Sequence, residues 1–359
     1  MQKILRRFLA VTVVGCVFTA TTRASAQEPF YKDKPIRIIV GLAAGGGFDT
    51  YARVIARHLA KHIPGKPTVV VENMTGAGSI IAANHVYNVA KPDGLTVGHF
   101  VGSYFLTQIL GQEGINFDAR KFEYIGAPSK DYVACAVPRE KGVSTVVEWM
   151  ASRAPLKIGG TGRGGTIENA IRIFQVALGL PVQLVSGYKG TSDVRLAIDS
   201  GELDAGCWEW GGMKIAWQQK LESGEVVVVL QAAPTAYGDL PNVPLARNLA
   251  KSDSSRRLLQ AGVEVPGTVI RSFVLPPSTP KERVQILRKA FQDTMSDPEF
   301  LAEAKKSKLD VDPIAGEELK QNVDELFFSR AYDDNQAQRH SSEVGEPSRS
   351  ELGLRNCPI

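Results

Sequence analysis

The sequence is poor in cysteine and histidine, and it lacks the common motifs of catalysis. Four cysteines occur in 359 residues, with no CxxC pair and no zinc-type spacing. GxSxG, HExxH and Walker A motifs are all absent. Of the five histidines, His58 and His62 share one face of a predicted helix, but no acid close in the sequence completes a metal site. These absences argue against a hydrolase, a zinc site and a P-loop nucleotidase.

The chain also lacks excess charge once its first 26 residues are set aside. The whole sequence has 42 basic and 38 acidic side chains. Residues 1–26 contain four basic side chains and no acid, so the remainder is balanced at 38 of each sign. A neutral chain has no general attraction for nucleic acid or anionic lipid. We therefore expect no nucleic-acid partner.

Residues 1–26 have the three parts of a secretory signal peptide. Lys3, Arg6 and Arg7 precede an apolar run over residues 8–18, and Ala24-Ser25-Ala26 is a small-residue cleavage site. The run is too short to span a bilayer, which needs about 20 residues. Cleavage before a lipidated Cys16 is an alternative. We favour simple secretion because the apolar run continues through Cys16.

Strand and helix patterns alternate along the rest of the chain. The first series predicts a strand at 36–40, a helix at 50–62 capped by Asp49, and strands at 68–72 and 95–101. The second predicts the following elements: strands at 133–137, 156–159, 182–186, 203–207 and 226–230, and a helix at 166–178 that ends at Gly179. Thr279 begins a predicted capping box. This rhythm is typical of an α/β fold with parallel, doubly wound sheets. The polar, aperiodic segment 333–359 is predicted to be a disordered tail.

Three glycine-rich loops each follow a predicted strand and precede a helix. Their candidate ligand-binding residues are Ala44, Gly45, Gly46, Gly47, Phe48 and Asp49 in the first loop; Gly76, Ala77, Gly78 and Ser79 in the second; and Thr161, Gly162, Gly164, Gly165 and Thr166 in the third. Glycine lets a ligand approach the backbone, and helix N-termini attract anions. One such loop alone is more often a plain turn. Three together predict a site for a small anion, above all a carboxylate.

The third loop also matches the dinucleotide fingerprint at Gly160, Gly162 and Gly165. That fingerprint needs an acid at the end of the next strand to bind the ribose. Here the strand ends at Ser186, followed by Gly187, and no carboxylate stands there. A dinucleotide-dependent oxidoreductase is therefore an alternative that we rank low, and we predict neither a cofactor nor catalysis.

The strand end at Cys207, Trp208 and Glu209 is the fourth candidate binding segment. An indole ring could stack on a flat ligand, and Glu209 could accept a hydrogen bond. Packing of Trp208 in a core is an equal alternative. Cys207 and Cys135 both lie in predicted strands, where two buried free thiols are favoured over a disulfide.

Short motifs in a fixed order resemble the Bug/TctC proteins, the solute-binding components of tripartite tricarboxylate transporters. They begin with the strand at 34–40, then Gly45-Gly46-Gly47 with Asp49, then Val69 to Asn73 with Gly76-Ala77-Gly78, then Pro92-Asp93-Gly94. Later matches include Tyr188-Lys189-Gly190 and Leu240 to Pro244. The resemblance covers about residues 30–319. Departures occur at Phe48, at Gly165 and in the segment after Leu319. Phe48 and Trp208 would narrow or flatten the cleft, which makes an aromatic or amide-bearing acid a candidate beside a citrate-like ligand.

The resemblance implies a two-lobed periplasmic binding protein with two chain crossings between the lobes. Residues 27–127 with 233–332 are expected to form one lobe and residues 128–232 the other. The four candidate segments would line the cleft between them. The expected partners are a small organic acid and a membrane permease, and the protein is expected to be a monomer in the periplasm. A sensory component using the same cleft is an alternative.

Overall fold

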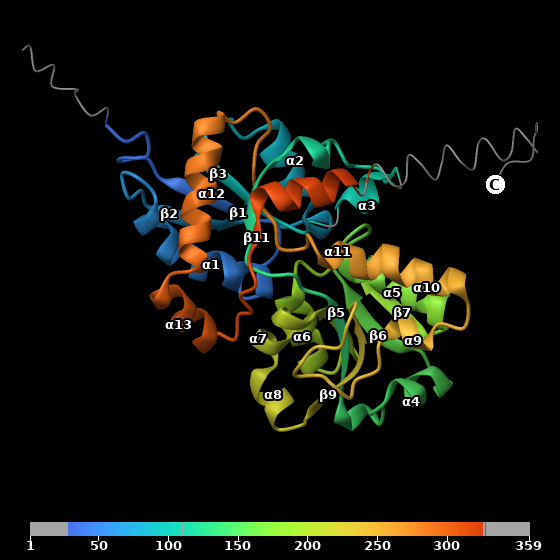
Figure 1. The fold of residues 1–359 in the computed structure, drawn as a ribbon. Helices are drawn as coiled ribbons and strands as arrows, with labels where there is room; N and C mark the ends of the chain where they lie inside the picture. The colour runs from blue at the N-terminus through green and yellow to red at the C-terminus, as the bar shows by residue number, and fades with distance from the viewer. Residues whose placement is uncertain (1–27, 103, 110, 326, 328–359) are drawn as a thin grey trace, which may run out of the picture.

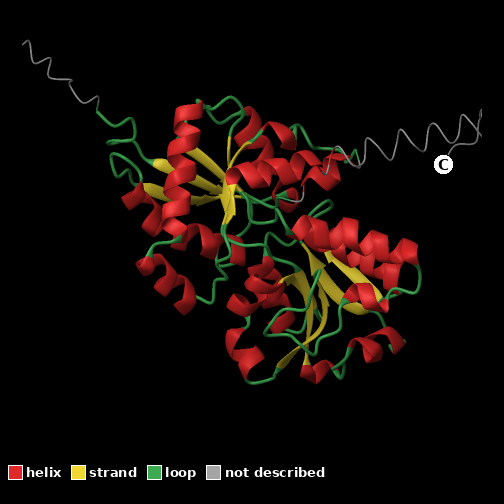
Figure 2. Ribbon diagram, in the orientation of Figure 1, coloured by secondary structure: helices red, strands yellow, loops and turns green. Residues whose placement is uncertain are grey.

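The computed structural model describes residues 28–102, 104–109, 111–325 and 327, which form two lobes (Figure 1). The predicted signal segment with Cys16 and the predicted tail at 333–359 lie outside the described residues. Within the described part, every helix is too short or too polar to cross a membrane. Both lobes are mixed α/β units with helices packed against sheets (Figure 2).

The first lobe contains a six-stranded sheet in the order β11-β4-β10-β3-β1-β2. Its strands are β1 (Ile36–Val40), β2 (Val69–Asn73), β3 (Thr96–His99), β4 (Glu123–Ala127), β10 (Phe273–Leu275) and β11 (Ile314–Ala315). β1 pairs in parallel with β2 and β3, as predicted. β10 is antiparallel to both β3 and β4, so the all-parallel expectation is wrong there. The chain re-enters this lobe from the second one, and its returning strand therefore runs in the opposite direction.

Helices cover both faces of this sheet. They are α1 (Gly47–Leu59), α2 (Ile80–Asn88), α3 (Tyr104–Ile109), α12 (Lys281–Met295) and α13 (Pro298–Lys306), with short 3₁₀ turns at Ala60–His62, Ala77–Ser79 and Ala119–Lys121. Asp297 caps α13 through Glu299 N and Phe300 N. The predicted capping box at Thr279 is wrong, because its hydroxyl donates to the carbonyl oxygen of Pro276 instead.

Two histidines, His58 on α1 and His62 on the 3₁₀ turn that follows it, bond to acids of α13 and of its N-cap. His58 Nε2 lies 2.7 Å from Glu303 Oε2, and His62 Nε2 lies 2.8 Å from Asp297 Oδ2. These acids lie more than 230 positions away in the sequence, so residues close to the histidines do not reveal them. His58 is also buried rather than solvated as expected.

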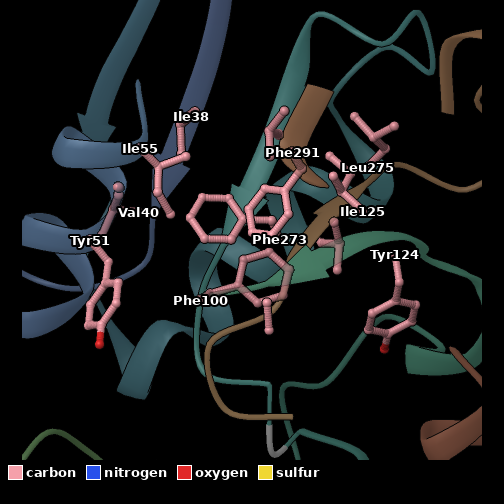
Figure 3. Packing of buried hydrophobic residues seen from close by; sticks show 14 of the residues in the cluster. Ile38, Val40, Tyr51, Ile55, Phe100, Tyr124, Ile125, Phe273, Leu275 and Phe291 are labelled. Atoms are coloured by element: carbon pink, nitrogen blue, oxygen red, sulfur yellow. The ribbon is translucent and has the colours of Figure 1, made fainter. Parts of the chain in front are cut away.

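Aromatic side chains fill the core between the sheet and α12 (Figure 3). Phe273 on β10 lies 5.4 Å from Phe291 on α12, measured between ring centroids. On its other side Phe273 stacks on the imidazole of His99 at 4.0 Å. Full burial of such a side chain stabilises the fold by roughly 1.5–3 kcal/mol. This packing holds β10 in place and with it the segment just before β10, which contributes to the candidate site.

The second lobe has a three-stranded sheet whose strands pair antiparallel, so the parallel expectation is wrong there as well, and a two-stranded parallel sheet. Its strands are β5 (Val133–Pro138), β6 (Leu156–Gly160), β7 (Val182–Ser186), β8 (Gly206–Glu209) and β9 (Val226–Ala232). Its helices are α4 (Val146–Ala151), α5 (Thr166–Leu178), α6 (Thr191–Asp199), α7 (Trp210–Ala216), α8 (Gln218–Glu222), α9 (Ala246–Leu249), α10 (Asp253–Leu259) and α11 (Val265–Gly267), with a 3₁₀ turn at Arg139–Lys141 and a π-helical turn at Gln260–Glu264. α5 has the predicted bounds and ends at Gly179, whose φ of 73° is the left-handed conformation that glycine adopts readily.

The chain returns to the first lobe later than the sequence suggested. Residues 233–332 were all expected in the first lobe. Leu240, Ala246, Leu259 and Val263 instead belong to the core of the second lobe. We define the first crossover as residues 128–132 and the second as residues 264–268. The amide of Asp131 donates to the carbonyl of Gly267 at 3.0 Å, so the two crossovers lie side by side.

Candidate functional site

The glycine-rich loops of the first lobe touch loops of the second lobe directly. Gly78 N donates to the carbonyl of Thr161 at 3.1 Å, and Ala43 N donates to the carbonyl of Lys189 at 3.1 Å. The side-chain amide of Gln112 donates to the carbonyl of Arg163 at 2.8 Å. The structure therefore has the lobes closed on each other, and we call this contact region the lobe interface.

The second loop, Gly76 to Ser79, holds an unusual backbone at this interface. Ala77 and Ser79 have φ values of 47° and 81°, which non-glycine residues rarely adopt. The hydroxyl of Tyr104 donates to the carbonyl of Gly78 at 2.7 Å and supports the loop from within the lobe. A Cβ on Gly78 would lie 2.9 Å from the Cα of Gly165. Only glycine at position 78 lets the lobes approach this closely.

The third loop places the N-terminus of α5 against the second loop. Gly165 is the N-cap of α5 and Thr166 is its first residue. Glu168 is buried, and its Oε1 accepts from Gly162 N at 2.8 Å, which fixes the turn of the loop. Gly162 and Gly165 both lie against Gly78. The structure thus brings the second and third predicted segments together at the N-terminus of α5.

The first loop, Ala44 to Asp49, meets a different part of the second lobe. A Cβ on Gly46 would lie 2.9 Å from Thr191 Oγ1, and one on Gly47 would lie 2.9 Å from the Cα of Gly212. Gly45, by contrast, has open space around it. The first loop therefore faces residues 189–191 and the start of α7 rather than the third loop.

Asp49 organises the first loop from inside the first lobe. α1 begins at Gly47 with Gly46 as its N-cap, so the prediction that Asp49 caps the helix is wrong. The Asp49 carboxylate accepts from Gly45 N, Arg53 Nε and Asn73 Nδ2, at 2.8–2.9 Å. Burial alone would raise the pKa of Asp49, but these hydrogen bonds outweigh it and hold the pKa below its ordinary value. Asp49 is thus an ionised structural residue.

The structure draws Cys207 and Trp208 into the core of the second lobe. Cys207 on β8 forms a disulfide with Cys135 on the neighbouring β5, so the favoured prediction of free thiols is wrong. Trp208 is fully buried and packs on Trp217 with ring centroids 4.7 Å apart. Trp208 thus packs in the core, which was one of its two predicted roles; the other was stacking on a ligand. Its Nε1 has no hydrogen-bond partner among the described residues.

An ion pair that was not predicted from the sequence lies beside the crossovers. Arg271 Nε and Nη2 donate to Asp131 Oδ2 at 2.9 and 2.6 Å, and both side chains are buried. Asp131 Oδ1 also accepts from Gly211 N at 3.0 Å. Phe48 of the first loop lies over the guanidinium of Arg271, 4.9 Å from ring centroid to Cζ. One sequence signal was available: Arg271 is an isolated cation in the otherwise apolar and small-residue segment 265–277.

Two further titratable groups lie near Arg271. Burial raises the pKa of Glu209, although the charge of Arg271 opposes this. Burial lowers the pKa of His99 to about 3, so its imidazole is neutral. His99 Nδ1 bonds to the carbonyl of Ser272, which leaves Nε2 as an acceptor that has no partner in the described chain. The site therefore combines the buried Arg271–Asp131 ion pair with Glu209, whose pKa is raised, and the neutral imidazole of His99.

The arrangement at Gly160 does not resemble a dinucleotide site. The carbonyl of Gly160 accepts from Gly187 N and Tyr188 N, both at 3.1 Å. β7 ends at Ser186, and no carboxylate follows where a ribose would need one. Gly165 lies against Gly78 of the other lobe, where the backbone of a dinucleotide site would face the pyrophosphate.

Comparisons with known proteins agree on one family. The family model for the tripartite tricarboxylate transporter family receptor, TctC, matches residues 51–327. A UPF0065 protein of Cupriavidus necator is 26% identical over 303 residues, covering 82% of this chain and 84% of that protein. Among solved structures, the periplasmic binding protein BugD has a TM-score of 0.70 at 23% identity, covering 86% of this chain and 99% of that one. MatC from Rhodopseudomonas palustris, solved with bound malate, has a TM-score of 0.66 at 22% identity, covering 84% and 98%. At such identities the solved structures show a shared fold.

Proposed function

Because the chain belongs to the TctC family of tripartite tricarboxylate transporter receptors, we propose that it captures a small organic acid between its lobes and delivers it to a membrane permease. The observation that carries this proposal is the meeting of glycine-rich loops at the lobe interface, where Gly78 bonds to Thr161 and Ala43 to Lys189. α1 and α5 both begin at these loops. Helix N-termini favour an anion, and a carboxylate is the common anion of metabolites.

The proposal includes lobe opening and closing about the two crossovers. The contacts between the lobes are hydrogen-bonded loops, the start of α1 against α7, and the ion pair of Lys214 with Asp310, whereas each lobe has its own hydrophobic core. Hinge closure around a ligand is a common motion in such two-core proteins. The four predicted segments take different roles in it. The loops 44–49, 76–79 and 161–166 form the contact surface, and Glu209 approaches it from β8, whereas Cys207 and Trp208 stabilise the lobe behind it.

We also propose a periplasmic location and a monomeric state. The signal-like residues 1–26 support export. The Cys135–Cys207 disulfide supports an oxidising compartment, because such bonds are rare in the cytosol. MatC was solved with malate, which supports a carboxylate ligand for this chain. The departures at Phe48 and Gly165 lead us to include aromatic and amide-bearing acids among the candidates.

A thermal-shift screen of residues 27–359 tests the proposed function. The panel contains malate, citrate, benzoate and asparagine, with malamide and benzamide as neutral controls and NADH as the test of the dinucleotide alternative. A ligand at 100 times its Kd stabilises the fold by about 2.7 kcal/mol, which corresponds to a rise in Tm of roughly 5–10 °C. The expected result is a rise with at least one carboxylate and none with its neutral analogue. A rise with NADH alone would contradict the proposal.

A genetic experiment separates transport from sensing. If the protein delivers its ligand to a permease, deleting the permease abolishes uptake of the acid found in the screen. If it is a sensory component instead, the same deletion leaves the transcriptional response to that acid intact.

A further inference from the structure

Arg271 is a buried cation whose hydrogen-bonding capacity is only partly used. Its exposed fraction is 0%, and Nε and Nη2 both bond to Asp131. The third nitrogen, Nη1, is buried without a hydrogen-bond partner among the described residues. A buried charged donor without a partner costs free energy, so such a group in a native protein points to a ligand or another bound partner.

The guanidinium lies against the start of α1. A Cβ on Gly47 would lie 3.2 Å from Nη2 and 3.5 Å from Nη1 of Arg271. The rings of Phe48 and Tyr51, both on α1, lie 4.9 and 4.3 Å from Cζ. α1 has 13 residues, and Gly46 as N-cap provides no side-chain hydrogen bond to its first N–H groups. The partial positive charge of the helix start therefore lies beside Nη1, a guanidinium donor that Asp131 leaves unused, and an anion would stabilise both.

The nearby acids leave this point free for an added carboxylate. Asp131 bonds to Arg271 and to Gly211 N, so its charge is already matched. Asp49 is held by Arg53 on the other side of the first loop. Burial favours the protonated form of Glu209, which in that form can donate a hydrogen bond. Neutral His99 adds no charge.

We propose that Arg271 binds the carboxylate of the captured acid through Nη1, with the first N–H groups of α1 on the opposite side of that carboxylate. This inference rests on the proposed function and adds a charged anchor to an interface otherwise built from backbone amides. Arg271 follows the second crossover and Asp131 lies in the first, so the anchor is attached to both crossovers. Binding of the acid thereby also fixes the crossovers relative to α1, which couples capture to lobe closure.

Three variants test the anchor against the carboxylate that gives the largest shift in the screen. Arg271→Gln combined with Asp131→Asn removes both charges, so that no unpaired carboxylate stays buried. Arg271→Lys retains a cation for Asp131 but cannot offer the second nitrogen in the plane of a guanidinium. Arg247→Gln combined with Glu264→Gln is the matched control, because Arg247 also pairs with a buried acid, Glu264, which is the first residue of the second crossover. Titration calorimetry gives each Kd, and circular dichroism with urea unfolding verifies each fold.

The expected result is that the Kd rises by at least about 30-fold in the double variant and in Arg271→Lys, equivalent to about 2 kcal/mol at 1.4 kcal/mol per tenfold change. The control should stay within about threefold of wild type. Wild-type affinity in either folded Arg271 variant would overturn the anchor while leaving capture by the lobes intact. Absence of binding to every carboxylate by the wild-type protein would instead refute the proposed function itself.

Discussion

Substitution of Gly78 by alanine is expected to separate the closed state from the stability of the lobes. Gly78 has φ of 61°, and the left-handed conformation costs an alanine roughly 1–2 kcal/mol. That cost applies whether the lobes are open or closed. The new methyl group would also lie 2.9 Å from the Cα of Gly165 in the other lobe, whereas carbon atoms in contact are about 3.5–4.0 Å apart. This second effect exists only when the lobes are closed.

The clash can be converted into an expected loss of affinity. To relieve it, the loops must separate by at least about 0.6 Å, given the contact distance above. The Gly78 N to Thr161 O hydrogen bond, now 3.1 Å, would then lengthen to a distance at which it no longer forms. Its loss is worth about 1 kcal/mol, so the Kd for the carboxylate should rise by roughly fivefold or more.

Gly142 offers a matched control for this prediction. Its φ is 72°, and no heavy atom lies within 4 Å of a Cβ built there. Gly142→Ala should therefore lower the free energy of unfolding by a similar amount in urea titrations and leave the Kd from calorimetry unchanged. Scattering with and without ligand should show incomplete compaction for Gly78→Ala alone. If Gly78→Ala loses stability as the control does yet binds and compacts like wild type, the contact with Gly165 is not part of the bound state.

Three further predictions follow from the geometry. Replacing Cys135 and Cys207 together by alanine opens a loop with a sequence separation of 72. The free energy of unfolding in urea should fall by about 2–4 kcal/mol. An unchanged free energy in the variant, or wild-type protein that is equally stable with and without reductant, would contradict a stabilising bond. Glu209 has a raised pKa, so its contribution to stability is complete below its ordinary pKa of 4.5 and is lost as the pH rises through its pKa in the folded state. Glu209→Gln should remove this loss of stability with rising pH in thermal melts. An unchanged dependence of Tm on pH would show that Glu209 does not cause it. Asp49 has a lowered pKa, so its contribution is present above its ordinary pKa of 3.8 and is lost as the pH falls through the folded-state value. Asp49→Ala should remove this acid-sensitive part and weaken carboxylate binding by loosening the first loop, and wild-type affinity in calorimetry would remove the loop from the site.

Local patterns predicted most of the elements well, for physical reasons that can be named. β1 is a run of β-branched residues buried on both faces except at Arg37, and its bounds match the prediction. α5 lies between Gly165 and Gly179, two residues whose conformations start and stop a helix. The predicted cap was wrong for α1, because its N-cap is Gly46, which has no side chain to bond to the helix. Asp49 has the composition of a cap, but it bonds back to Gly45 from within the helix.

The pairing of distant segments was harder to predict, because the sequence gives no distance between them. The chain continues through α9 and α10 before it leaves the second lobe, and the apolar residues of those helices fit either core by composition. The disulfide depends on the register of β5 and β8, which places Cys135 opposite Cys207. Neither strand contains a signal for that register by itself, so free thiols were the natural prediction.

The Arg271–Asp131 pair shows why a buried ion pair is harder to predict from a sequence than a glycine-rich loop. Glycine-rich loops are visible because each one is a continuous motif with a local mechanism. The ion pair joins residues 140 positions apart, and it forms only because the two crossovers run side by side. A buried arginine is stable there because Asp131 balances its charge and the rings of Phe48 and Tyr51 cover its face. An isolated cation in an apolar segment thus indicates that a distant acid must pair with it. In a two-lobed chain, an arginine after one crossover can pair with an acid of the other crossover, because the two crossovers lie side by side.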